Sequence, residues 1–159
     1  MLKWMINTMF YISYFYQVRF FDKSILPVST AIWDPKWFHD NRTQAVEFRD
    51  KRQVLNGFRY PSLNPAKIYD EGSDCKPNCD KSPDTCAFLT KYESMLNSLD
   101  FDSVVADLQR YADRYFCKDV VLLVHEAPSN PCSERCKLVK WFNSHGYELP
   151  EWSKKDTGE

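Results

Sequence analysis

The sequence predicts an α/β fold, a single-domain, Rossmann-like arrangement in which a mostly parallel sheet is flanked by helices, with a long irregular region that contains cysteines. Residues 119–124 form a continuous aliphatic run of strand length, which is typical of a central strand covered on both faces. Two amphipathic helical patterns precede this run, and a third follows it. Strands and helices that alternate in this way form parallel sheets with right-handed connections.

The strands are predicted from runs of β-branched and aromatic residues. The first is expected at residues 9–14 and the second within residues 25–32, where Pro27 indicates a late start. We expect the 119–124 strand to be central, with the 9–14 strand as its neighbour. Residues 33–74 contain several prolines and show no regular period, so they are predicted to be a long loop region.

The helices are predicted from apolar residues that recur every three or four positions. One pattern covers residues 84–99, and the next follows Asp102, a plausible N-cap. The last helix begins at Cys132 or Ser133 and ends at Gly146, which is expected in the left-handed conformation.

Length and composition limit the class of protein. The 159 residues fit one globular domain, which we assign to residues 1–152, followed by a polar tail at residues 153–159. Hydrophobic residues make up 43% and charged residues 27%, which excludes disordered and fibrous proteins. The net charge of −1 gives no basic field of the kind that coats nucleic acid.

The apolar start of the chain, residues 1–21, fits neither a signal peptide nor a membrane span. It lacks the aliphatic run and the small-residue cleavage site of a secretory signal, and polar residues interrupt it. We therefore expect a cytoplasmic protein with no membrane partner. Cysteines in that compartment are reduced, and metal binding is commoner there than disulfide bonding.

The functional site is predicted in the segment after residue 124, because ligands of parallel α/β sheets bind beyond the carboxyl ends of central strands. Glu126 is expected to act as acid, base or nucleophile. Arg135 and the helix start are expected to hold a phosphate, and Ser133 and Cys132 add a hydroxyl and a thiol there. The alternative is a capped loop in which Glu126 and Arg135 form an ordinary ion pair.

Aromatic residues near the second strand suggest a surface that stacks on a nucleobase. Trp37 and Tyr11 are the predicted stacking rings, and Lys36 would add a cation. The alternative is that these rings fold back into the core. The full set of expected ligand-binding residues is Tyr11, Ser13, Ser29, Lys36, Trp37 and Cys132.

Three cysteines in the irregular region form a candidate zinc site. Cys75, Cys79 and Cys86 are close in sequence, and zinc takes four thiolate or imidazole ligands. The fourth ligand is left open among Cys117, His125, Cys132 and Cys136. The alternative is that Cys86 faces the helix core while the other two are surface thiols.

The sequence resembles the uncharacterised family catalogued as domain of unknown function 488. The resemblance covers most of the chain and rests on residues 10–15, 27–31, 35–38, 119–124, 126–128, 132–135 and 141. Members typically carry a glutamate and a proline after the last core strand, then Cys-His-Arg at the start of a helix that ends in a tryptophan. Here Cys-Ser-Glu-Arg replaces that triplet, so the histidine is missing and Cys132 lies one residue too far from Arg135.

The resemblance implies a small bacterial or bacteriophage α/β protein in the cytoplasm of a bacterial host. Some members are labelled N-glycosylase or DNA lyase-like.

Our first hypothesis is therefore an enzyme that acts on the glycosyl bond of a nucleoside, nucleotide or modified DNA base. The second is a noncatalytic phage factor that binds a small ligand or a host protein and is stabilised by a metal site. Two cooperating carboxylates or a raised pKa would favour the enzyme.

Overall fold

The sheet of the protein is parallel throughout, as the sequence predicts for an α/β fold. The structure, a computed structural model, describes residues 8–40, 54–69 and 83–154. Within them the sheet has four strands in the order β1-β4-β2-β3. The strands are β1 (Met9–Tyr14), β2 (Ile25–Ser29), β3 (Phe58–Arg59) and β4 (Asp119–Val124).

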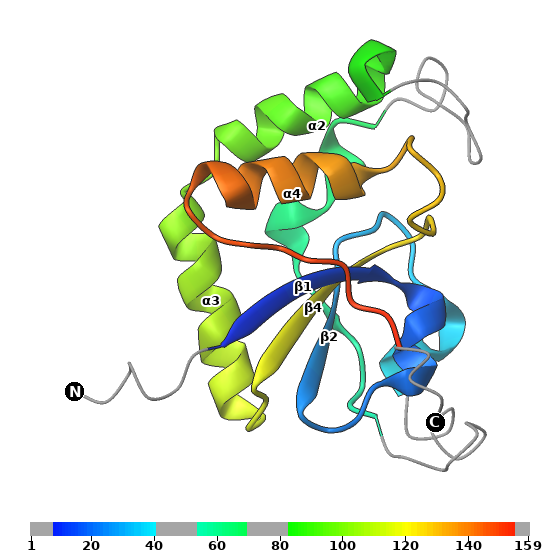
Figure 1. Ribbon diagram of the computed structural model, residues 1–159, viewed down its shortest axis with the longest axis vertical. Helices are drawn as coiled ribbons and strands as arrows, with labels where there is room; N and C mark the ends of the chain where they lie inside the picture. The colour runs from blue at the N-terminus through cyan, green and yellow to red at the C-terminus, as the bar shows by residue number, and fades with distance from the viewer. Residues whose placement is uncertain (1–7, 41–53, 70–82, 155–159) are drawn as a thin grey trace.

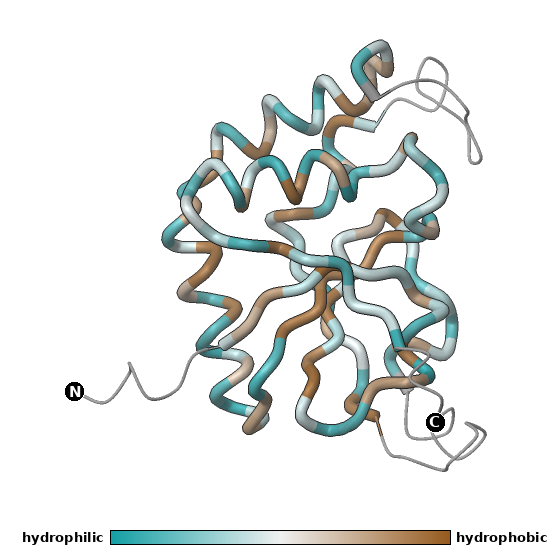
Figure 2. The backbone as a smooth tube through the Cα atoms, in the orientation of Figure 1, coloured by the Kyte–Doolittle hydropathy of each residue, from teal (hydrophilic) through white to brown (hydrophobic). Residues whose placement is uncertain are grey.

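The predicted central strand is confirmed. β4 pairs with β1 on one side, where Met9 faces Asp119, and with β2 on the other, where Ile25 faces the same residue. All residues of β4 after Asp119 are buried, and the strand is brown, that is hydrophobic, over that length in Figure 2. A strand covered on both faces needs no alternation of polar and apolar residues, which explains the continuous aliphatic run.

The expectation that Pro27 delays the second strand is wrong, because β2 begins at Ile25 and Pro27 pairs with Val121. The Ser29 carbonyl accepts a hydrogen bond from Tyr60 N–H, so the backbone N–H and C=O groups of odd-numbered residues in β2 point towards β3. The backbone of Pro27 points to the same side two residues earlier, where β3 has not yet begun. Its missing N–H therefore costs the sheet no hydrogen bond.

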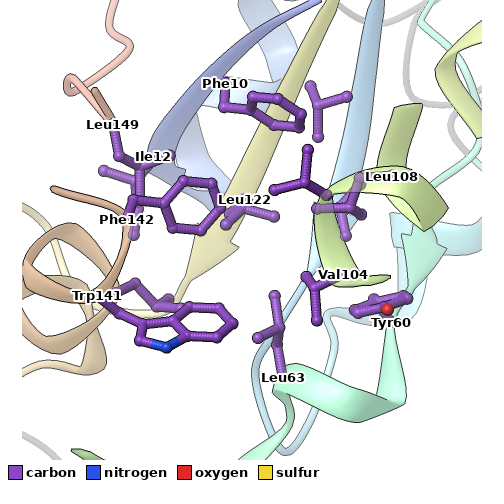
Figure 3. Packing of buried hydrophobic residues seen from close by; sticks show 14 of the residues in the cluster. Phe10, Ile12, Tyr60, Leu63, Val104, Leu108, Leu122, Trp141, Phe142 and Leu149 are labelled. Atoms are coloured by element: carbon purple, nitrogen blue, oxygen red, sulfur yellow. The ribbon is translucent and has the colours of Figure 1, made fainter. Parts of the chain in front are cut away.

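Helices cover one face of the sheet (Figure 1). They are α2 (Ala87–Asn97), α3 (Phe101–Arg114) and α4 (Glu134–Ser144). Figure 3 shows the core beneath them, where Leu122 of β4 meets Phe142 of α4 and Leu108 of α3. Glu93 of α2 also accepts hydrogen bonds from Lys137 and Lys140 of α4 at 2.8 and 2.7 Å, which fixes these two helices to each other.

The helix ends test the predicted caps. Ser133 accepts a hydrogen bond from Arg135 N–H as the N-cap of α4, and Gly146 has φ 84° after the helix, as expected. The cap predicted at Asp102 is wrong. Asp100 caps α3 by accepting from Ser103 N–H, and Asp102 lies in the first turn, where its charge favours the helix dipole.

Short 3₁₀ helices and loops cover the other face of the sheet. The segments Phe15–Phe20 and Lys36–Asp40 contribute Phe15 and Phe38, which pack against Val121 and Leu123 of β4. The two rings meet edge to face, with centroids 5.1 Å apart. This second cluster means that β4 contributes alternate side chains to two separate cores.

The end of the described chain runs beside β1 (Figure 1). Ile12 N–H donates to the Pro150 carbonyl at 3.0 Å, and Trp152 N–H donates to the Ile12 carbonyl at 2.8 Å. This contact covers the exposed edge of β1 and places Glu151 near the carboxyl end of the sheet. In the part of the chain that the structure describes, no helix has the length and hydrophobicity needed to cross a membrane.

Candidate functional site

A cavity of about 630 Å³ opens at the carboxyl end of the sheet, where the sequence places the site. Its walls come from the loops after β2 and β4 and from the starts of α2 and α4. The described residues that line it are Ala31, Ile32, Trp33, Tyr69, Phe88, Leu89, His125, Glu126, Ala127, Ser129, Asn130, Cys132, Ser133 and Glu134. Glu126, Ser133 and Cys132 of the predicted site therefore share one cavity.

Glu126 lines the cavity with an acceptor that has no partner. It lies two residues beyond the end of β4, and its Oε1 atom is buried without a hydrogen bond among the described residues. A buried carboxylate oxygen normally accepts at least one hydrogen bond, because losing water without compensation is costly. The Glu126 carboxylate therefore has one buried acceptor that no described residue satisfies.

Glu134 is the second acidic residue of the cavity. It occupies the first turn of α4, directly after the Ser133 cap. Burial and, to a smaller extent, the charge of Glu126 together raise the pKa of Glu134 to about 7. A carboxyl group with a pKa near neutrality can accept or release a proton at physiological pH.

Three aromatic rings form one wall of the cavity. Trp33 is 64% exposed, and its ring lies edge to face with Tyr69 at 6.1 Å between centroids. Tyr69 in turn meets Phe88 edge to face at 5.5 Å. The His125 ring nitrogen Nε2 hydrogen-bonds the Trp33 carbonyl, which ties the loop after β2 to the loop after β4.

Arg135 lies outside this set of lining residues, and its guanidinium is bound within the protein. Nε and one terminal nitrogen donate to the two carboxylate oxygens of Glu151 at 2.7 and 3.1 Å. The other terminal nitrogen donates to the Glu126 backbone carbonyl at 2.8 Å. The ion pair is therefore made with Glu151, and Arg135 fixes the backbone of Glu126 rather than its carboxylate.

Ser29 belongs to a separate polar network around Asp34, whose side chain is only 5% exposed. The Ser29 hydroxyl donates to one Asp34 oxygen. The other oxygen is 2.9 Å from Arg59 and 2.8 Å from His39, whose second ring nitrogen contacts the Gly57 carbonyl at 3.2 Å. Asp34 therefore does not join Glu126 in the cavity.

The other predicted ligand-binding residues lie away from the cavity. Ser13 is buried and donates to the Trp152 carbonyl at 2.6 Å, while Tyr11 and Trp37 pack against the second core cluster. Lys36 is exposed on the 3₁₀ helix beside Trp37. Of the two tryptophans in this loop, Trp33 rather than Trp37 presents its ring to the cavity.

Only one of the three predicted zinc ligands lies among the described residues. Cys75 and Cys79 lie outside the described residues, and Cys86 is buried at the start of α2. Cys132 and Cys136 pack against the same apolar cluster as Cys86. Within residues 8–40, 54–69 and 83–154, no three His, Cys, Asp or Glu side chains are grouped to hold a metal ion. The zinc site stays a prediction.

Sequence reasoning did not assign a role to Glu134, Tyr69 or Phe88. The signal for Glu134 was its position in the first turn of a helix that starts at the predicted site, because that turn faces the strand ends. Phe88 was expected in the core from its helical period, and it does pack there while also lining the cavity. Tyr69 carries no pattern in the sequence that points to a site.

Comparison of the chain with protein-family models, with curated proteins and with solved structures finds no match. The resemblance to the domain of unknown function 488 therefore stays a prediction, and the cavity is the feature of the protein that bears on its function.

Proposed function

We propose that the protein is a hydrolase that cleaves the N-glycosidic bond of a nucleoside or a modified DNA base. The observation that supports this most strongly is that Glu126 and Glu134 line one cavity and that the pKa of Glu134 is raised to about 7. Paired carboxyl groups are the usual equipment for hydrolysis at an anomeric carbon. The aromatic wall supplies a surface on which a base can stack.

In this proposal the two carboxyl groups have different tasks. Glu126, whose Oε1 has no protein partner, faces the positive charge that develops on the sugar as the bond to the base breaks. Glu134 accepts a proton from the attacking water, a task suited to a group with a pKa of about 7. Ser133 and Arg135 position these residues, the first by capping α4 and the second by holding the Glu126 backbone.

The test is to incubate the purified protein with a panel of nucleosides and of oligonucleotides with modified bases, and to measure the released base by chromatography. Cleavage should rise with pH through about 7, because Glu134 must be ionised to accept the proton. Glu126→Gln and Glu134→Gln should each lower the rate at least about 100-fold, whereas the exposed control Glu148→Gln should not. Binding without any cleavage would favour the noncatalytic alternative.

We also propose that Cys75, Cys79 and Cys86 bind a structural zinc ion. Cys132 and Cys136 pack against the same apolar cluster as Cys86, which supports either of these thiols as the fourth ligand. Elemental analysis of protein purified without chelator should give about one zinc per chain, and chelation should lower the melting temperature. Less than a tenth of a metal ion per chain would contradict this proposal.

A further inference from the structure

We infer that the cavity takes a planar organic cation, such as a nucleobase that carries a positive charge through N-alkylation. The inference rests on the proposed function, since it specifies the substrate class of the same site. Two features of the lining carry it: the aromatic wall and the two acidic side chains, which no described lysine or arginine of that lining balances.

The aromatic wall suits a cation because ring faces carry negative potential. Trp33, Tyr69 and Phe88 all line the cavity, and consecutive rings in this order meet edge to face. Indole is the ring that binds cations best, and Trp33 is the most exposed of the three. A neutral base would stack on the same rings, but a cation gains the electrostatic attraction as well.

The acidic side chains set the sign of the charge. When both are ionised, Glu126 and Glu134 place two negative charges in a partly desolvated cavity, and their mutual repulsion raises the pKa of Glu134. A bound cation offsets that repulsion and compensates the charge of a Glu126 carboxylate whose Oε1 has no partner among the described residues. The other titratable groups of the lining are Tyr69, His125 and Cys132. Arg135 and the phenol of Tyr92 also lie nearby, and Arg135 is already paired with Glu151.

An anionic ligand is disfavoured for the same reasons. The start of α4, which would attract a phosphate, already has the Glu134 carboxyl group in its first turn. The guanidinium of Arg135 is committed to Glu151 and to the Glu126 carbonyl. The phosphate site expected from the sequence is therefore filled by groups of the protein itself.

The chemistry of hydrolysis also fits a cationic base. The C1′–N bond breaks, and its electron pair returns to the ring nitrogen and neutralises the ring. Water adds its oxygen to C1′ and gives one proton to Glu134. The base leaves uncharged, so no acid is needed to protonate it, and the site needs only the two anions that it has.

The experiment uses one ring in three charge states, measured by calorimetry at pH 8: 1-methylnicotinamide (cation), nicotinamide (neutral) and nicotinate (anion). We expect the cation to bind at least tenfold more tightly than the neutral ring and the anion not to bind. Equal affinity for the three compounds, or no binding of the cation, would overturn the inference.

Variants locate the binding and separate it from cleavage. Trp33→Leu should weaken cation binding about 5- to 30-fold, whereas Phe116→Leu, a control at an aromatic residue that is 90% exposed and outside the cavity, should not. 1-Methylnicotinamide has no glycosidic bond, so its binding is independent of catalysis. Nicotinamide riboside carries the same cationic ring on a sugar, and if the first compound binds while the second is not cleaved, the proposed function fails and this inference stands.

Discussion

Asp34 and Glu126 are acidic residues that follow neighbouring strands of one sheet, yet their carboxylates differ in how many partners they have. Asp34 follows β2, and each of its oxygens is bound, one by Ser29 and the other by Arg59 and His39. Glu126 follows β4, and its buried Oε1 has no partner among the described residues. The two loops are joined by the hydrogen bond between His125 and the Trp33 carbonyl.

The comparison separates a structural carboxylate from a functional one. A buried charge that is fully hydrogen-bonded and paired holds its surroundings in place, and removing it leaves its partners unpaired. A carboxylate oxygen that has no partner holds no neighbouring group in place, and such groups are found most often at functional sites. Substitution of Asp34 is therefore expected to lower stability, whereas substitution of Glu126 is expected to lower function.

Asp34→Asn should have the largest effect on stability. The substitution leaves Arg59 and His39 without their counter-charge, and we expect the free energy of unfolding to fall by about 2–4 kcal/mol. Urea unfolding measures this, with the exposed Asp113→Asn as control. In a double-mutant cycle, Arg59→Gln should cost much less in the Asp34→Asn background than in the wild type. A loss below about 0.5 kcal/mol would remove the distinction between the two carboxylates.

The sequence predicted the fold well because the decisive signals are local. The aliphatic run of β4, the run of β1 and the helical periods each report burial directly. The start of β2 was predicted wrongly because the effect of Pro27 depends on where β3 begins, and that is set by tertiary structure. Likewise Asp102 and Asp100 are equally good caps in the sequence, and only the path of the chain selects Asp100.

The site was predicted only in part, for a physical reason. Strand ends locate the cavity, so Glu126 and the start of α4 were found from the order of the elements. Which charges pair is decided by contacts distant in sequence, and Glu151, which takes up Arg135, lies 16 residues further along the chain. The choice of Trp33 over Trp37 depends in the same way on how one loop folds over the sheet edge.

Glu134→Gln should stabilise the protein, and more so at high pH. The pKa of Glu134 is raised from 4.5 to about 7 in the folded state, so between these values the folded form holds a proton that the unfolded form has lost. The contribution of Glu134 to the free energy of unfolding therefore declines as the pH rises towards 7. Removing the charge should add about 1–2 kcal/mol at pH 8 and little at pH 5. Unfolding in urea at both pH values tests this, and equal effects at both would mean that the buried charge of Glu134 is not what destabilises the fold.

Arg135→Lys should cost about 1 kcal/mol, because an ammonium group cannot make both the paired contact with Glu151 and the bond to the Glu126 carbonyl. Glu151→Gln should cost a similar amount, and the double variant should cost less than the sum. The affinity for 1-methylnicotinamide should fall by less than it does in Glu126→Gln, since the guanidinium does not line the cavity and acts only through the Glu126 backbone. A tenfold loss of affinity without loss of stability would place Arg135 in the binding site after all.

Glu126→Gln should have the smallest effect on stability and the clearest effect on function. The substitution keeps the shape of the side chain and removes a charge whose Oε1 has no partner, so the free energy of unfolding should change by less than about 0.5 kcal/mol. Binding of the cation should weaken at least tenfold, because the ligand loses a desolvated counter-charge. The same change removes the repulsion that helps to raise the pKa of Glu134, so the pH at which Glu134 titrates should move down. An NMR titration of the Glu134 side chain follows that shift independently of any ligand. If Glu126→Gln instead destabilises the protein as much as Asp34→Asn and leaves binding intact, Glu126 is a structural residue like Asp34.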